Sequence, residues 1–386
     1  MINSTSLAKI VQIKKGKKEQ ESSLYSDNRK RYLQIEDLRT NQNIKFCTPS
    51  NKSVEVCNDD VLIAWDGANA GTVGFQLAGI IGSTLARLRV DTEKAYPQYL
   101  GRYLQFRFPE IRNNCTGATI PHVSGHHLRE LSVPLPPLPE QKRIATILDK
   151  ADVLRDKRKK SIAKLDELLQ SVFHDMFGDP LASSDWCQVK VEALALPVKG
   201  SIRTGPFGSQ LLHSEFVDDG IAVLGIDNAV NNTFRWGERR YITVEKYKIL
   251  KKYTVKPGDV LITIMGTCGR CAIVPDDIPL AINTKHLCSI TLNKEICLPE
   301  YLHSCFLMHK EVLKQLGISQ KGAVMPGLNM QIIKNLKVPL PPISLQEKYK
   351  KRVSRILELR RIHEKSDELS RNSFFSLQQR AFRGEL

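Results

Sequence analysis

The sequence VPLPP occurs twice in this chain, and each copy is followed at once by a long stretch typical of an α-helix. The first copy opens VPLPPLPEQKRIATIL at 133–148, and the second opens VPLPPISLQEKYKKRV at 338–353. The residues before them also match, because GATIPHVSGHHLRELSVPLPP at 117–137 aligns without a gap with GAVMPGLNMQIIKNLKVPLPP at 322–342. Copies separated by about half the chain indicate a tandem duplication of a whole domain together with its helix.

Before each VPLPP, the chain contains short apolar runs broken by Gly, Asn and Asp, which is the pattern of strands and turns. The best strand candidates are VLIAW, GIAVLG, DVLITI and CAIV. Helical spacing is confined here to short segments around 97–107 and 299–315. We therefore expect two strand-rich domains in tandem, of the α+β class.

After each VPLPP, the pattern predicts a long helix. Proline cannot continue a preceding strand or helix, whereas Pro139 suits a first helical turn. Apolar side chains then recur every three or four residues as far as Met176, and again from about 345 to 382. A helix of this kind, roughly 57 Å long at 1.5 Å per residue, cannot bury its apolar stripe alone. We expect the two helices to pack together as a coiled coil.

The charge and composition of the chain limit the kinds of partner that it can bind. The formal net charge of the 386 residues is +16, which favours an anionic partner, either nucleic acid or an acidic membrane surface. The sequence contains no run of about 18 apolar residues, so no membrane span is predicted. The N-terminus MINSTSLAKIVQIKKGKKEQ lacks the apolar centre of a signal peptide, so we expect the chain in the cytoplasm. Nine scattered cysteines fit reduced thiols there.

Catalytic motifs are missing. The chain lacks the Asn/Asp-Pro-Pro-aromatic tetrapeptide of adenine methyltransferases, glycine-rich phosphate loops and clustered carboxylates for metal-assisted hydrolysis. Cys268 and Cys271 have the spacing of a redox or zinc site, but no second CxxC completes a ligand set, so two small strand residues are favoured. The three histidines of PHVSGHH at 121–127 are interpreted as surface residues that could touch DNA. GPFGS at 205–209 is interpreted as a turn with a packed phenylalanine. We expect neither catalysis nor a metal site.

Two strand-rich domains, each closed by VPLPP and a long helix, resemble the specificity (S) subunit of Type I restriction–modification enzymes. The residues that carry the resemblance are VPLPPLPEQKRIATILDKAD at 133–152, VPLPPISLQEK at 338–348, GPFGS at 205–209 and LQQRAFRGEL at 377–386. The chain departs from the family pattern in two places. The first domain has no GPFGS counterpart, and the second helix begins ISLQEKY rather than a form closer to LPEQKRI.

The resemblance implies an architecture with pseudo-twofold symmetry. Target-recognition domains would occupy 1–137 and 181–342, and spacer helices would occupy 138–180 and 343–386 and pack antiparallel. By resemblance, each domain reads one half of a bipartite, asymmetric site in double-stranded DNA, and the helices fix the gap between the halves. Two readers on a rigid spacer multiply selectivity, because the second binding event becomes intramolecular.

The resemblance also implies partners. The helices would dock two modification (M) subunits, which carry methyl transfer with S-adenosylmethionine. Restriction (R) subunits, driven by ATP and Mg, would join the assembly, and this chain would bind no cofactor itself. Two other interpretations stay open: a stand-alone DNA-binding protein or specificity module of another modification system, and a coiled-coil scaffold whose basic charge meets membrane or RNA.

Base readout needs polar side chains on loops that reach a groove, whereas phosphate contacts need only positive charge. Candidates in the first domain form a basic N-terminal stretch with two loop residues: Lys14, Lys15, Lys17, Lys18, Arg29, Lys30, Arg31, Asn69 and His122. Candidates in the second domain are mainly arginines: Arg203, Arg235, Arg239, Arg240, Arg270, Lys285 and Lys321. Candidates for subunit docking lie on the apolar stripes of the helices: Ile144, Leu148, Leu165, Leu169, Val353 and Ile356.

Overall fold

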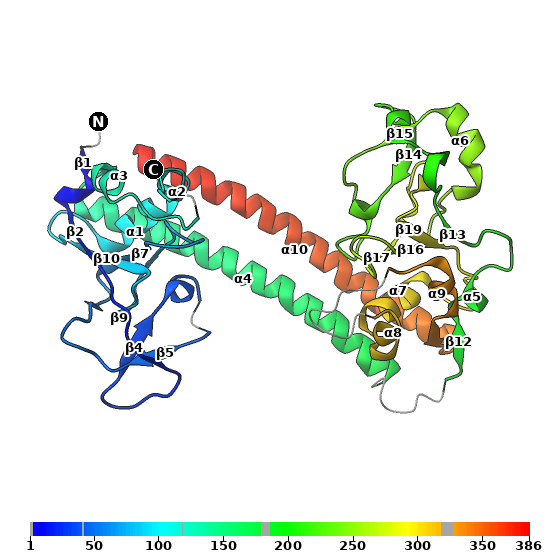
Figure 1. Ribbon diagram of the computed structural model, residues 1–386, viewed down its shortest axis with the longest axis horizontal. Helices are drawn as coiled ribbons and strands as arrows, with labels where there is room; N and C mark the ends of the chain where they lie inside the picture. The colour runs from blue at the N-terminus through cyan, green and yellow to red at the C-terminus, as the bar shows by residue number, and fades with distance from the viewer. Residues whose placement is uncertain (1–2, 41, 118, 179–185, 318–326) are drawn as a thin grey trace. The chain divides into compact units, whose positions relative to one another are not determined.

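The computed structural model describes residues 3–40, 42–117, 119–178, 186–317 and 327–386 (Figure 1). The chain forms two compact units, and each contains part of both long helices. Unit 1 comprises residues 1–160 and 364–386, and unit 2 comprises residues 161–363. Each unit therefore combines one domain with parts of both long helices, and the units do not follow the order of domains and helices along the chain.

Unit 1 is built on a four-stranded antiparallel sheet in the order β2-β10-β7-β8. Its strands are β2 (Val11–Lys15), β7 (Asp60–Ala64), β8 (Val73–Phe75) and β10 (Leu85–Val90). A second sheet, in the order β3-β5-β4-β9-β6, comprises β3 (Glu21–Ser22), β4 (Lys30–Leu33), β5 (Lys45–Cys47), β6 (Glu55–Val56) and β9 (Gly79–Ile81). The short strands β1 (Ser4–Ser6) and β11 (Ser132–Pro134) pair with each other. The short helices are η1 (Leu7–Lys9), η2 (Ile35–Leu38), α1 (Pro97–Phe106), α2 (Phe108–Asn113) and α3 (Gly125–Glu130).

Unit 2 has a four-stranded antiparallel sheet in the order β13-β19-β16-β17. Its strands are β13 (Ile202–Thr204), β16 (Val260–Thr263), β17 (Cys271–Ile273) and β19 (Leu287–Ile290). A second sheet, in the order β15-β14-β18, comprises β14 (Ile221–Leu224), β15 (Tyr241–Ile242) and β18 (Ala281–Asn283), while β12 (Gln188–Lys190) pairs with β20 (Lys337–Pro339). The α-helices are α5 (Val191–Leu194), α6 (Val244–Leu250), α7 (Pro299–Met308), α8 (Lys310–Gln315) and α9 (Met330–Asn335). The 3-10 helices are η3 (Gly208–Gln210), η4 (His213–Glu215), η5 (Ile226–Asn228) and η6 (Lys251–Tyr253).

The two units repeat one topology. Their four-stranded sheets correspond strand for strand, and the parallel pair β4–β9 in unit 1 matches the parallel pair β14–β18 in unit 2. In both units a helix of ten residues, α1 or α7, packs on the strand of the DVLI motif, β7 or β16, and on the next strand, β8 or β17. The predicted α+β class and the predicted duplication are confirmed.

The long helices α4 (Leu138–Phe177) and α10 (Ile343–Arg383) begin directly after the double prolines. In each case the carbonyl of the second proline accepts the first hydrogen bond. Pro137 accepts from Glu140 N at 2.8 Å, and Pro342 accepts from Leu345 N at 2.9 Å. The missing N–H of proline costs nothing here, because the first N–H groups of a helix have no partner within the helix. The prolines therefore set where each helix starts.

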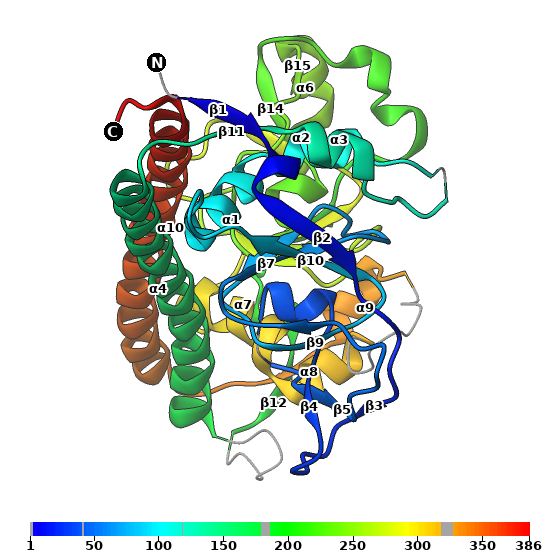
Figure 2. The same cartoon turned by 90° about the vertical axis from the view of Figure 1, so that its left-hand side faces the viewer.

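Within each unit, the start of one long helix packs against the end of the other. In unit 1, Ile144 of α4 shares a core with Phe382 of α10. In unit 2, Phe173 near the end of α4 lies against Tyr349 at the start of α10, with ring centroids 5.9 Å apart. Pairing start with end makes the helices antiparallel, as predicted, and both views show the two ribbons side by side (Figures 1 and 2).

A buried glutamine in the first turn of α4 joins this helix to the domain before it. Gln141 is 1% exposed. Its Oε1 accepts a hydrogen bond from Tyr96 N at 2.8 Å, and its Nε2 donates to the carbonyls of Lys94 at 3.1 Å and Pro136 at 2.8 Å. One side chain thus holds the start of α1, the double proline and the long helix together.

The second copy repeats this junction. Gln346 is fully buried, and its Oε1 accepts from Leu298 N at 2.8 Å. Its Nε2 donates to the carbonyls of Ile296 at 3.1 Å and Pro341 at 2.9 Å. The partners occupy the same places in the repeat, so the junction is a property of the duplicated unit.

A buried tyrosine reinforces each junction from the short helix. Tyr99 of α1 donates its hydroxyl to the carbonyl of Pro134 at 2.8 Å, and Tyr301 of α7 donates to the carbonyl of Pro339 at 2.7 Å. Burial raises the pKa of both phenols well above the ordinary value, so both remain protonated donors.

The aspartate that begins each DVLI strand is buried and bound by an arginine, but the two units supply that arginine from different strands. In unit 1, Arg89 of β10 donates to both oxygens of Asp60 at 3.0 Å. Burial favours a higher pKa for Asp60, yet the hydrogen bonds from Arg89 and from Cys57 N hold that pKa below its ordinary value. In unit 2, the corresponding Asp259 is paired instead with Arg203 of β13.

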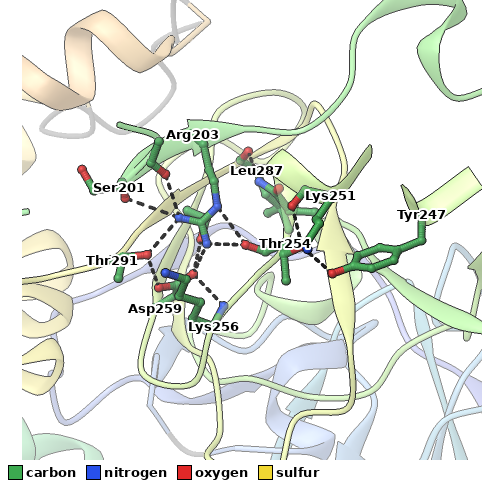
Figure 3. Close-up of polar contacts among 12 residues, drawn as sticks. Ser201, Arg203, Tyr247, Lys251, Thr254, Lys256, Asp259, Leu287 and Thr291 are labelled. Atoms are coloured by element: carbon green, nitrogen blue, oxygen red, sulfur yellow. Dashed lines mark hydrogen bonds and ion pairs between the residues drawn. The ribbon is translucent and has the colours of Figure 1, made fainter. Parts of the chain in front are cut away.

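The Arg203 guanidinium is completely occupied inside unit 2 (Figure 3). Besides Asp259, its Nε donates to the carbonyl of Thr254 at 3.0 Å, and its Nη1 donates to Thr291 Oγ1 at 2.9 Å. The side chain is only 8% exposed. The predicted DNA contact of Arg203 does not fit this arrangement, because its guanidinium is used inside the core of unit 2.

Replacing Gln346 with Leu keeps the volume of the side chain and removes its three hydrogen bonds. Three backbone groups would lose their partner, and two of them, the N–H of Leu298 and the carbonyl of Pro341, are buried. This loss costs about 2–4 kcal/mol, and the melting temperature should fall by roughly 5–10 °C. Differential scanning calorimetry checks this, with Gln170→Leu on the exposed face of α4 as the control. Equal melting temperatures for both variants would contradict the role of the junction.

Replacing Arg203 with Met should destabilise unit 2 by about 3–5 kcal/mol, because it leaves the buried charge of Asp259 without a partner. The free energy of unfolding in denaturant measures the effect. Arg270→Met, at an exposed arginine of the same unit, is the control and should change the stability little. A free energy of unfolding unchanged in Arg203→Met would show that the ion pair is dispensable.

Candidate nucleic-acid interface

Two of the predicted DNA contacts in unit 1 converge on Asp66. Lys15, at the end of β2, forms an ion pair with Asp66 Oδ2 at 2.6 Å, and His122 Nδ1 lies 2.6 Å from Asp66 Oδ1. Burial alone would raise the pKa of Asp66, but the hydrogen bonds from Lys15 and His122 hold it below its ordinary value. The sequence separates these residues widely, whereas the fold makes them one half-exposed cluster.

The other predicted contacts of unit 1 differ in how freely they can meet a ligand. Lys14, Lys17 and Lys18 are exposed on and just beyond β2. Four other side chains already have partners inside unit 1. These partners are the carbonyl of Leu24 for Arg29 (2.9 Å), Glu55 for Lys30 (2.5 Å), Asp37 for Arg31 (2.7 Å) and Arg39 for Asn69 (3.0 Å). The Lys30 pair is exposed and therefore weak, so a phosphate could replace it.

In unit 2, the structure gathers the GPFGS segment and two predicted contacts around one cavity of about 630 Å³. We call it the GPFGS cavity. Arg240, Lys285, Asp227 and Glu238 supply its charged lining. Burial lowers the pKa of the lining His286, and the nearby charges of Lys285 and Arg240 lower it further, so this ring is neutral at pH 7.

Glycine is required at the start of this segment. A Cβ at Gly205 would overlap the backbone of Asn283 and Thr284, so no other residue fits. Gly208 has a φ of 57° and lies in open space. Phe207, expected to be packed, is instead 48% exposed, so that prediction is wrong. The close approach of the two backbones turns the phenylalanine outward and leaves Pro206 and Gly208 to line the cavity.

The remaining predicted contacts of unit 2 are dispersed. Arg235, Arg239 and Arg270 are exposed, and the Arg239 guanidinium lies 5.4 Å from the ring centroid of Trp236. Lys321 lies outside the described residues.

Unit 2 contains a second, strongly basic cavity of about 520 Å³ that the sequence did not predict, and we call it the lysine cavity. Lys199, Lys251, Lys252 and Lys256 line it, and all four are exposed. Over the ranges that the structure describes, none of the four forms an ion pair; Lys252 Nζ lies 5.0 Å from the ring centroid of Tyr253. Uncompensated lysines around a hollow favour an anionic ligand. The run KKY at 251–253 was the available signal, but no pattern showed that Lys199 would join it.

The predicted docking residues are mostly inside the chain's own core. Ile144, Leu148, Val353 and Ile356 are 0–7% exposed, which leaves no surface for another subunit. Packing between α4, α10 and the domains uses these four side chains, so they do not fit the predicted docking role. Leu165 and Leu169 are half-buried. The apolar side chains that α4 and α10 do expose are Val153, Leu154, Leu168, Leu357, Leu359, Ile362, Leu369 and Phe375.

Only one residue of the CxxC pair is a strand residue, so the prediction of two strand residues is wrong for Cys268. This cysteine lies in the turn between β16 and β17, is half-buried and donates its thiol to the carbonyl of Ile264 at 3.2 Å. Cys271 is buried in β17, and burial raises the pKa of its thiol well above the ordinary value. Among the residues that the structure describes, no group of three or more His, Cys, Asp or Glu could hold a metal ion. No helix in the described ranges is long and apolar enough to cross a membrane.

Comparisons with solved structures agree on the fold. The S subunit of a Type I restriction–modification system from M. genitalium superposes with a TM-score of 0.60 at 18% identity, covering 99% of this chain and 96% of that one. A chain from a study of complex assembly and conformational transition of the Type I system superposes with a TM-score of 0.56 at 14% identity, covering 100% and 98%.

Comparisons with characterised sequences give the same family. The MjaVIII specificity subunit of Methanocaldococcus jannaschii is 26% identical over 354 residues, covering 87% of this chain and 81% of that protein. The EcoBI specificity subunit of Escherichia coli is 25% identical over 351 residues, covering 85% and 74%. The model of the Type I restriction modification DNA specificity domain matches residues 3–167 and 218–370. With one match in each half of the repeat, this chain belongs to the Type I restriction–modification DNA specificity family.

Proposed function

We propose that this chain is the sequence-reading subunit of a Type I restriction–modification assembly. Each unit contributes one target-recognition domain, and each domain reads one half of a bipartite, asymmetric site in double-stranded DNA. The observation that carries the proposal is the duplication of one specificity domain, each copy joined to a long helix through the same buried glutamine. A chain that reads two half-sites needs two DNA-binding interfaces, and a tandem repeat of one domain supplies both.

Charge supports DNA as the ligand. The net charge of +16 would attract a polyanion at long range. The lysine cavity in unit 2 and the exposed Lys14, Lys17 and Lys18 in unit 1 would contact phosphates, which position a protein without reading sequence. Base readout then falls to side chains with defined geometry, such as those of the GPFGS cavity.

The helices would set the gap between half-sites and dock two M subunits. Each unit exposes apolar side chains from both α4 and α10. Exposing apolar surface to water is unfavourable, and exposed apolar side chains are typical of an interface. These side chains are Val153, Leu154, Leu369 and Phe375 in unit 1, and Leu168, Leu357, Leu359 and Ile362 in unit 2. Two comparable surfaces fit two copies of one partner.

The chemistry would belong to the partners. Methyl transfer with S-adenosylmethionine would be carried by the M subunits, and ATP- and Mg-dependent cleavage by the R subunits. This chain would recognise the target site on the DNA, and it would do so in the cytoplasm.

Coexpression with a methyltransferase subunit tests the proposal directly. Cells that contain both chains should methylate adenine at one bipartite motif, and cells that contain either chain alone should not. Single-molecule sequencing of the host genome maps the methylation. The absence of any motif despite a soluble complex would contradict the proposed function.

The lysine cavity can be tested by its salt dependence. The double substitution Lys251→Ala/Lys252→Ala should weaken binding of the complex to specific and unrelated DNA by similar factors. The slope of log K against log salt should fall by about one per lysine. The control is Lys248→Ala/Lys294→Ala, at exposed lysines of unit 2 that do not line the cavity. A loss confined to the specific site would contradict a phosphate role.

A further inference from the structure

We propose that the Asp227–Arg240 pair, with Thr284, reads a base pair in the half-site bound by unit 2, and that this base pair presents an amine beside an acceptor. The inference rests on the proposed function and names the residues that would perform its reading step. All three residues line the GPFGS cavity.

The pair offers one acceptor and one donor that no described residue of the chain uses. Asp227 Oδ1 accepts from Arg240 Nη2, which fixes the two side chains against each other. Among the residues that the structure describes, Asp227 Oδ2, Arg240 Nε and Thr284 Oγ1 are buried atoms with no hydrogen-bond partner. Buried polar atoms are almost always satisfied in proteins, so three such atoms on residues that line one cavity favour a ligand that completes them.

The fold does not require this pair. The turn after β14 is closed by Gly225 N, which donates to Asn228 Oδ1 at 2.8 Å. The matching turn in unit 1 is closed by Gln34 N, which donates to Asp37 Oδ2 at 2.8 Å. In unit 1, Asp37 both closes the turn and pairs with an arginine. In unit 2, the turn is closed by the neutral Asn228, and a different residue, Asp227, pairs with the arginine. Asp227 is therefore free of that structural role.

The charges argue against a simple phosphate site. Asp227 and Glu238 line the same cavity as Arg240 and Lys285, so two carboxylates offset the two cations. A phosphate would be repelled by the carboxylates, and the lysine cavity is a far better place for one. A carboxylate that is already neutralised by an arginine can approach DNA and accept a hydrogen bond from a base.

The donor and acceptor pattern limits which base can be read. A carboxylate oxygen accepts from an exocyclic amine, and the arginine donates to the acceptor beside it. In the major groove these groups adjoin on adenine, as N6 and N7, and across a C·G pair, as cytosine N4 and guanine O6. Apolar lining from Leu211, Phe216 and Ile226 would surround the bases and exclude water.

Substitutions in the complete complex with its methyltransferase partner test the inference. Asp227→Asn keeps the shape of the side chain but changes an acceptor into a donor. It should lower discrimination at one base pair of the second half-site by about 5- to 150-fold. Thr284→Val leaves the ion pair intact and should lower discrimination by about 3- to 10-fold. Asp276→Asn, at an exposed aspartate of unit 2 outside the cavity, is the matched control.

The readout is the motif recovered from a randomised DNA library after methylation, with calorimetry to show that each variant is folded. The expected result is a relaxed or altered preference at one position of the second half, with the first half unchanged. An unchanged motif in both folded variants would overturn the inference, and so would an equal loss on all sequences. A wild-type complex that yields no bipartite motif would overturn the proposed function, and the inference with it.

Discussion

The hydrogen bonds of Gln141 and Gln346 are the constraint on which the rest of the structure depends. Each glutamine is buried and forms hydrogen bonds with three backbone groups, so that each joins a double proline, a short helix and a long helix. The long helix therefore leaves its domain at a fixed place and in a fixed register. A spacer between two DNA-reading domains is useful only if its ends are rigid, and these junctions supply that rigidity.

The duplication preserved what holds each unit together and changed what each unit presents. Both units keep the glutamine, the tyrosine bonded to a proline carbonyl, and the buried aspartate of the DVLI strand. The arginine that neutralises this aspartate comes from different strands, from β10 in unit 1 and from β13 in unit 2. The turn after the parallel strand has also changed its charged residues. Two copies that differ at such turns can read different sequences on one scaffold.

Much of the fold could be predicted from the sequence, because strands, helices and repeats follow from local periodicity and proline chemistry. The candidate site could be predicted only in part, because burial and pairing are long-range properties. Arg203 looks like any loop arginine until the fold brings Asp259 and Thr291 to it. Leu148 belongs to an apolar stripe, but only the packing shows that its own domain covers it. Lys199 joins Lys251 across about 50 residues of chain, which no short pattern reveals.

The measurement that tests the central claim most directly is an exchange of one domain. Residues 1–135 would be replaced by the matching domain of another specificity subunit, with Gln141 and the double proline kept, and genomic methylation would be mapped in the presence of the methyltransferase subunit. Two independent readers on a rigid spacer predict that one half of the motif changes while the other half and the gap stay the same. A change in both halves, or in the gap alone, would contradict the account.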